Sequence, residues 1–142
     1  MPERKAEAVW EGLVPEGTGE VSLGSGTYRA GYSFGSRFGS APGTNPEELL
    51  GAAHAGCFTM ALALALTEAG HPPTRVMTEA RVPIQKGPEG FRIPYIELVT
   101  RAEVPGLSAE DFQREAEKAK AGCPVSRALA ATEVRLTASL IG

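Results

Sequence analysis

Two cysteines, Cys57 and Cys123, are the residues of this sequence with the clearest capacity for chemistry. Cys57 lies halfway along an apolar stretch, residues 44–70, far from any helix terminus that could lower the pKa of its thiol. Its activation needs a cation from another segment. Arg37, in a preceding loop rich in glycine and serine, is the candidate, because a guanidinium stays charged and hydrogen-bonds a thiolate. The alternative is a small buried side chain that only fills space, as most free cysteines do.

Cys123 stands directly before Pro124, at the N-cap position of a predicted short helix. The free N–H groups and the dipole at a helix start stabilise a thiolate. Cys123 is therefore well placed to act as an attacking or leaving sulfur, and a packing role fits the sequence equally well.

His54 precedes Cys57 by three residues, so the two share a helix face. A Cys–His pair could serve nucleophilic catalysis, but side chains at this spacing run side by side and rarely align for proton transfer. The favoured interpretation is a half-buried histidine that a neighbouring group satisfies. A zinc site formed by His54, Cys57, His71 and Cys123 has little support, because His71 follows the end of the predicted helix.

The stretch 44–70 predicts one long helix with signals at both ends. Residues 49–66 carry no charge and reach the lower length of a membrane span, but they are mostly small and lack aromatic or basic flanks, which favours the centre of a core. The end signals are an N-cap, a proline at the first helical position, two first-turn carboxylates, and a closing glycine followed by prolines: Asn45, Pro46, Glu47, Glu48, Gly70, Pro72 and Pro73.

The other segments predict an α+β fold in one domain, residues 1–142, with an antiparallel β-sheet packed on the long central helix. A period of two predicts strands, and helical patterns follow Ser108 and Cys123. The expected elements are an edge strand at 5–10, a hairpin of 20–23 and 27–34, a loop at 35–43, strands at 76–85 and 91–104 with a bend at Pro94, helices at 108–122 and 124–131, and a closing strand at 133–141.

The charge balance argues against several kinds of partner. The chain has 14 basic and 17 acidic residues, a net charge of −3, and no block of like charge, so neither nucleic acid nor a membrane surface is an expected partner. No apolar signal segment opens the sequence, so we expect the reducing cytoplasm, where a static structural disulfide is unusual.

Two segments are specific enough to indicate a family. GTNPEELLGAAHAGCFTMAL, residues 43–62, followed by AKAGCPVS, residues 119–126, resembles the OsmC/Ohr family of thiol-dependent peroxidases. The histidine of HAGCF stands where the Ohr (organic hydroperoxide resistance) branch tends to carry tyrosine, so the OsmC branch is the better match. The resemblance covers nearly the whole chain.

The resemblance implies a role for four residues. Cys57 matches the peroxidatic cysteine, which becomes a sulfenic acid, and Cys123 the resolving cysteine, which condenses with it to a disulfide. Arg37 matches the arginine that holds the thiolate, and Glu47 the glutamate that holds this arginine. The implied substrates are organic hydroperoxides and hydrogen peroxide. A dithiol reductant restores the thiols, of the lipoyl type in the Ohr branch.

The family further implies an OsmC-like fold in an intertwined homodimer, with the central helices packed together, active sites at the interface, and neither metal nor organic cofactor. Glu47 and Cys57 are about 15 Å apart along one helix. If both serve one site, either the long Arg37 side chain bridges them or Glu47 comes from the partner subunit, and we expect the second.

Three other functions remain open from the residues alone. A Cys-dependent hydrolase or acyl transferase would use Cys57 and His54 and survive loss of Cys123. A redox sensor would oxidise without efficient turnover. In a purely structural protein neither thiol would react.

Overall fold

The computed structural model describes residues 1–142, and the chain forms two compact units, residues 1–49 and residues 50–142. Helices and strands are mixed along the chain, as the α+β prediction required. We expected a single domain over residues 1–142. Whether the two units form one domain depends on how they assemble, so this stays a prediction.

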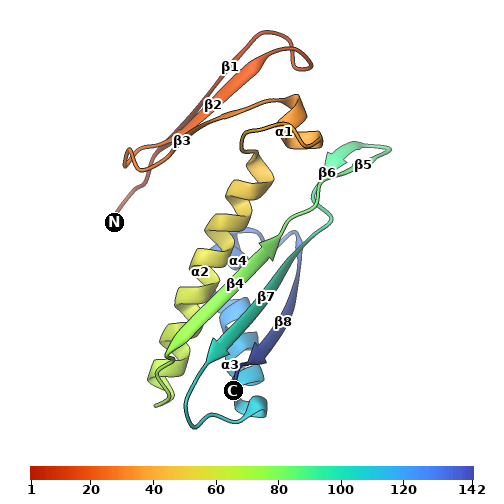
Figure 1. Ribbon diagram of the computed structural model, residues 1–142. Helices are drawn as coiled ribbons and strands as arrows, with labels where there is room; N and C mark the ends of the chain where they lie inside the picture. Colours follow the sequence, from red (N-terminus) through yellow and green to blue (C-terminus); the bar gives the residue numbers. More distant parts are fainter. The chain divides into compact units, whose positions relative to one another are not determined.

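The first unit contains a three-stranded antiparallel sheet in the order β1-β2-β3 (Figure 1). Its strands are β1 (Ala6–Glu11), β2 (Thr18–Leu23) and β3 (Arg29–Tyr32), which confirms the predicted edge strand and hairpin. Gly19, on the middle strand, pairs with Trp10 on one side and Tyr32 on the other. A Cβ there would come within 2.6 Å of both rings, so glycine lets the two rings meet at 5.3 Å between centroids.

A short helix, α1 (Phe34–Phe38), occupies part of the segment expected to be a loop. The prediction was wrong there because Ser33 and Ser36 cap the turn reciprocally. The Ser36 N–H donates to Ser33 Oγ at 3.1 Å, and the Ser33 N–H donates to Ser36 Oγ at 2.8 Å. A single turn of small residues carries no apolar period that would reveal it.

The long helix α2 (Pro46–Glu68) agrees with the predicted central helix. At its start Asn45 Oδ1 accepts the Glu48 N–H at 2.7 Å, and beyond its end Gly70 has a φ of +87°, as the sequence signals required. By length and composition alone α2 could cross a membrane, a test that core helices also pass. Phe58, Leu62 and Leu66 of α2 are fully buried in the second unit, so we retain the core-helix interpretation.

The second unit contains a three-stranded mixed sheet in the order β4-β7-β8. Strand β4 (Arg75–Arg81) is antiparallel to β7 (Tyr95–Glu103), whereas β7 is parallel to β8 (Glu133–Leu140). The expectation of a purely antiparallel sheet is wrong for this pair. Two helices, α3 (Ala109–Gly122) and α4 (Pro124–Ala128), join β7 to β8, and such a helical crossover lets the next strand run in the same direction (Figure 1).

Prolines account for the remaining differences among the strands. The expected strand 76–85 ends at Arg81, two residues before Pro83, and the expected strand 91–104 is interrupted at Pro94, as the predicted bend required. The residues between Pro83 and Pro94 form a small separate hairpin of β5 (Gln85–Gly87) and β6 (Gly90–Arg92).

The core of the second unit lies between one face of this sheet and the inner sides of α2 and α3. Alternate residues of β7 are buried and point to the helices, as a period of two requires. A chain of threonine hydroxyls also links α2 to the sheet: Thr59 donates to Thr78 at 2.8 Å, and Thr78 donates to Thr100 at 3.0 Å. The buried apolar side chains are Phe58, Leu62, Leu66, Ile96, Leu98, Ala102, Val104, Phe112, Ala116, Ala119, Cys123 and Ala138.

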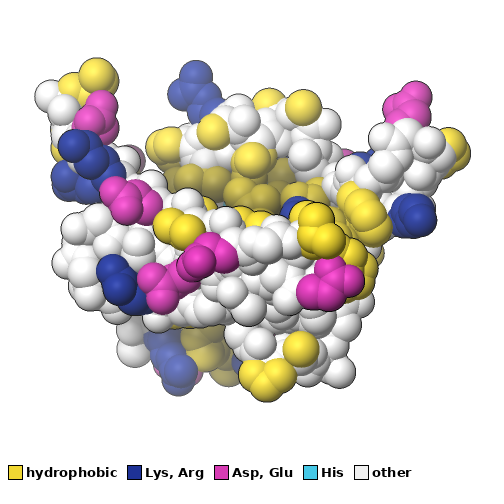
Figure 2. Space-filling model, turned by 90° about the horizontal axis from the view of Figure 1, so that it is seen from above, with side chains coloured by type: hydrophobic (Ala, Val, Ile, Leu, Met, Phe, Trp, Pro, Cys, Tyr) yellow, Lys and Arg dark blue, Asp and Glu magenta, His cyan; other side chains and the backbone are white.

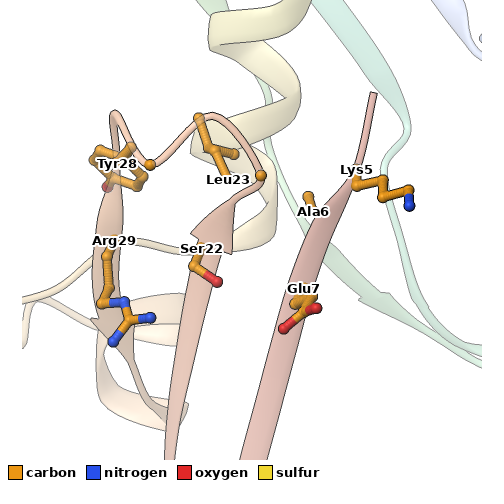
Figure 3. Close-up of a pocket in the computed structure, with 9 residues that line it drawn as sticks. Lys5, Ala6, Glu7, Ser22, Leu23, Tyr28 and Arg29 are labelled. Atoms are coloured by element: carbon orange, nitrogen blue, oxygen red, sulfur yellow. The ribbon is translucent and has the colours of Figure 1, made fainter. Parts of the chain in front are cut away.

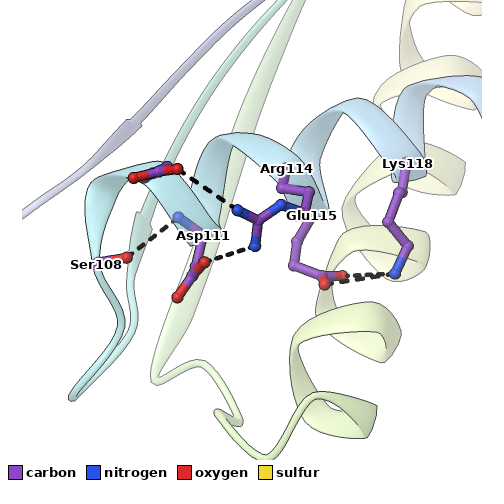
Figure 4. Close-up of polar contacts among 6 residues, drawn as sticks. Ser108, Asp111, Arg114, Glu115 and Lys118 are labelled. Atoms are coloured by element: carbon purple, nitrogen blue, oxygen red, sulfur yellow. Dashed lines mark hydrogen bonds and ion pairs between the residues drawn. The ribbon is translucent and has the colours of Figure 1, made fainter.

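Helix α3 is divided between a buried apolar side and an exposed charged side. At its start Ser108 Oγ accepts the Asp111 N–H at 3.2 Å and caps the helix. Figure 4 shows Arg114 bonded to Asp111, and Lys118 to Glu115, along the outer side of the helix. Exposed ion pairs contribute little to stability, so burial of the inner side holds this helix in place.

We predict that Phe112→Ala lowers the free energy of unfolding by about 3–5 kcal/mol, because a fully buried aromatic ring leaves a cavity between α3 and the sheet. Urea unfolding measured by circular dichroism gives this value. Arg114→Ala, two residues away on the outer side, is the matched control and should unfold close to the wild-type midpoint. Equal destabilisation by both variants would contradict this assignment of the core.

Candidate active site

The structure brings the two cysteines together. Cys57 Sγ and Cys123 Sγ lie 2.8 Å apart as free thiols, although 66 positions separate them in the sequence. A disulfide needs about 2.05 Å, so an approach of roughly 0.8 Å would join them. Cys57 is half-buried in the middle of α2, whereas Cys123 is fully buried where α3 meets α4.

The surroundings of Cys123 favour its thiolate, as the sequence predicted for this position. Burial raises the pKa of its thiol, but hydrogen bonds outweigh that effect and leave the pKa below its usual value. These bonds come from Cys57, from the backbone and side chain of Ser126, and from the backbone of Val125.

The surroundings of Cys57 in the second unit have the opposite effect. Burial raises the pKa of the Cys57 thiol, and the hydrogen bond with Cys123 raises it further. The backbone of Val125 lowers this pKa, but not enough to offset the other two effects. Cys57 therefore becomes a ready nucleophile only if a positive group stabilises its thiolate.

Arg37 and Glu47 form a two-point ion pair within the first unit. Arg37 Nε donates to Glu47 Oε1 at 3.1 Å, and Arg37 Nη2 donates to Glu47 Oε2 at 2.9 Å. The Glu47 side chain is 7% exposed, and the Arg37 side chain is 36% exposed. This fork-to-carboxylate geometry fixes the guanidinium plane, while part of the guanidinium remains accessible.

The pair lies within one chain, so the expectation that Glu47 would serve the arginine of a partner subunit is wrong. The chain between α1 and α2 folds back and places Arg37 beside the first turn of α2. Ser36 Oγ donates to the Thr44 carbonyl at 2.7 Å, and Asn45 Nδ2 donates to the Ser36 carbonyl at 3.1 Å. These bonds bring together residues that are ten positions apart.

His54 is bonded to Ser126, and both are buried. His54 Nε2 and Ser126 Oγ lie 2.7 Å apart, which confirms that a neighbouring group satisfies the histidine, although it is fully rather than half buried. Burial lowers the pKa of His54, so the imidazole is neutral at pH 7. Because its Nε2 is engaged by Ser126, the geometry does not favour the hydrolase hypothesis of a Cys57–His54 pair.

Sequence analysis missed Ser126 as a site residue. Its signal was weak, since a serine three residues after an N-cap is common in a first helical turn. The structure contains no group of three or more His, Cys, Asp or Glu side chains that could hold a metal ion, so the zinc alternative gains no support.

A shallow pocket in the first unit is separate from these residues. Lys5, Glu7, Leu23, Tyr28 and Arg29 contribute to its lining at one end of the three-stranded sheet (Figure 3). It contains neither cysteine and no member of the Arg37–Glu47 pair, so we assign it no part in the chemistry.

Comparison with known proteins identifies a family and several relatives. The family model for OsmC-like proteins matches residues 39–139. Peroxiredoxin OsmC of Escherichia coli (strain K12) is 50% identical over 129 residues, covering 90% of this chain and 90% of the relative. An organic hydroperoxide resistance protein of Xanthomonas axonopodis pv. citri (strain 306) is 39% identical over 87 residues, covering 61% of this chain and 59% of the relative.

Solved structures agree with these matches. The crystal structure of an organic hydroperoxide resistance protein from Elizabethkingia anophelis aligns with a TM-score of 0.78 and 29% identity, over 96% of each chain. The higher identity and wider coverage of the OsmC relative agree with the predicted branch. The chain belongs to the OsmC-like protein family.

Proposed function

We propose that the protein is a thiol-dependent peroxidase that reduces organic hydroperoxides and hydrogen peroxide through Cys57 and Cys123. The observation that carries this proposal is the pair of free thiols with sulfur atoms 2.8 Å apart. The names of the relatives, peroxiredoxin and organic hydroperoxide resistance protein, describe the same chemistry.

The reaction runs in three balanced steps. The Cys57 thiolate attacks one oxygen of the peroxide, the O–O bond breaks, and the products are a Cys57 sulfenic acid and an alkoxide that takes a proton to become the alcohol. The Cys123 thiolate then attacks the Cys57 sulfur, and the sulfenic hydroxyl leaves as water. An external dithiol reduces the resulting disulfide by thiol–disulfide exchange, and the reducing cytoplasm would supply such a reductant.

Exposure supports the order in which the cysteines act. Cys57 is half-buried and accessible to a small peroxide, whereas Cys123 is fully buried and adjacent to Cys57. Cys57 therefore meets the oxidant first, and Cys123 reaches only the sulfur that Cys57 presents. In this proposal Arg37, oriented by Glu47, supplies the positive charge that the Cys57 thiolate needs.

We also propose that the protein acts as a homodimer. One side of α2 carries a stripe of exposed apolar or small residues, Ala53, Gly56, Met60 and Leu64, of which Met60 is 76% and Leu64 59% exposed. Exposed apolar stripes of this kind are typical of interaction surfaces, and a helix face can pair with its own copy across a two-fold axis. Figure 2 shows apolar side chains at the molecular surface among interspersed positive and negative groups.

The peroxidase proposal predicts a loss of both thiols on oxidation. One equivalent of cumene hydroperoxide added to the reduced protein should abolish both free thiols and lower the intact mass by about two units, as a disulfide forms. Cys123→Ser should gain one oxygen instead and react with a sulfenic acid probe.

Cys57→Ser is the matched control, because it should consume almost no peroxide while its Cys123 stays reduced. Persistence of both thiols in the wild-type protein would exclude the proposed reaction. Rapid peroxide consumption by Cys57→Ser would reverse the roles of the two cysteines.

The dimer proposal predicts that Leu64→Lys produces monomers, because a charge on the α2 stripe would be buried without a partner. Sedimentation velocity measures the change. Leu13→Lys, at a position 75% exposed in the turn after β1, is the matched control and should retain the wild-type mass. A monomeric wild-type protein, or a Leu64→Lys variant with the wild-type dimer mass, would contradict the proposal.

A further inference from the structure

A continuous line of polar groups runs from α2 to the buried cysteine. His54 Nε2 lies 2.7 Å from Ser126 Oγ. Ser126 follows Cys123 by three residues, in the first turn of α4, and hydrogen bonding from its side chain lowers the pKa of the Cys123 thiol. Cys123 Sγ in turn lies 2.8 Å from Cys57 Sγ. His54 and Cys57 thus stand on the same helix and reach the same cysteine from two directions.

The hydrogen-bonding requirements of His54 give this line a direction. Its Nδ1 is buried and has no partner. A neutral imidazole carries one N–H and one bare acceptor nitrogen, and an unpartnered buried N–H is the rarer arrangement. The proton therefore belongs on Nε2, which donates to Ser126 Oγ, so the Ser126 hydroxyl proton is free to donate to the Cys123 sulfur.

Packing alone does not explain this arrangement. His54 is fully buried and Ser126 is 7% exposed, so both polar groups are removed from water at a free-energy cost. Apolar side chains of similar volume would fill the space without that cost. The pair is directed at the Cys123 sulfur, which has to become negatively charged in the second step of the proposed reaction.

We propose that His54 and Ser126 are positioning residues for the second step of the reaction, in which Cys123 resolves the Cys57 sulfenic acid. His54 holds the Ser126 hydroxyl in the orientation that donates to Cys123, and this bond keeps the sulfur as an aligned thiolate. The inference rests on the proposed peroxidase function and extends it to two residues outside the four site residues assigned above.

The chemistry of the step balances without another reagent. The Cys123 thiolate forms the S–S bond as the S–O bond of the sulfenic acid breaks. The Cys123 sulfur is oxidised, the Cys57 sulfur is reduced, and the hydroxide that leaves takes up the proton given up when the Cys123 thiol ionised. Ser126 and His54 keep their own protons throughout, so they orient the thiolate and do not act as a general base.

The test separates the two chemical steps. Ser126→Ala and His54→Leu should slow formation of the Cys57–Cys123 disulfide about ten-fold, the order expected for loss of one hydrogen bond to a charged group. Acid-quenched intact mass after a single addition of cumene hydroperoxide measures this rate. The same substitutions in a Cys123→Ser background should change the rate of Cys57 oxidation, followed by sulfenic acid trapping, less than two-fold.

Two further variants guard against a general effect on folding. His54→Gln keeps an N–H at the reach of Nε2 and should restore most of the disulfide rate, which simple loss of packing would not allow. Ser139→Ala removes an exposed hydroxyl on β8 and should behave as wild type. In a Cys57→Ser background, Ser126→Ala should move the thiolate absorbance transition of Cys123 to higher pH.

The outcomes distinguish this inference from the function on which it rests. If the wild-type protein forms no Cys57–Cys123 disulfide, the proposed peroxidase reaction fails, and this inference fails with it. If the wild-type protein forms the disulfide and both variants match its rate, or slow both steps equally, only the role of His54 and Ser126 is overturned. Selective slowing of the disulfide step with recovery in His54→Gln supports it.

Discussion

The packing of one side of α2 against the mixed sheet determines where the reactive sulfur stands. Phe58, Leu62 and Leu66 follow one another at intervals of four, so they form a single buried row on the helix. Cys57 precedes Phe58 by one position, about 100° around the helix, and therefore lies at the edge of this row. That position makes it half-buried: held firmly by the core, yet within reach of a small molecule.

The same core places the second sulfur. Cys123 belongs to the buried cluster itself, at the joint between α3 and α4, and its backbone N–H donates to the Ala119 carbonyl at 2.9 Å. The inner residues of α3 fix this joint against the sheet. Two sulfurs far apart in the sequence thus meet because Cys57 lies on α2 and Cys123 between α3 and α4, and these helices pack around one core. The surroundings lower the pKa of Cys123 and raise that of Cys57, which leaves Cys57 dependent on a cation.

Much of this arrangement could be predicted from the sequence because its signals are local. The caps at Asn45 and Gly70, the N-cap position of Cys123 and the bend at Pro94 each depend on one residue and its immediate neighbours. The thiol pairing came from the family resemblance, since spacing alone cannot bring Cys57 and Cys123 together.

The features that were not predicted depend on contacts between particular side chains or elements, which neither a period nor a single residue of the sequence reveals. The parallel direction of β8 follows from the two-helix crossover, and helix α1 depends on a reciprocal pair of serine bonds. The Arg37–Glu47 pair within one chain depends on the backbone folding back before α2. The role of Ser126 depends on its contact with His54, 72 positions away in the sequence, so it could not be recognised without the structure.

The central proposal is that the Arg37–Glu47 pair supplies the charge that Cys57 lacks in its own surroundings. The most direct measurement is the pKa of Cys57 in Cys123→Ser, from the pH dependence of thiolate absorbance, with and without Arg37→Met. The account predicts a pKa below the usual value of about 8.5 when Arg37 is present and a clear rise when it is replaced. Arg101→Met, an exposed arginine on β7, is the control and should leave this pKa unchanged. An unaltered Cys57 pKa in Arg37→Met would contradict the account.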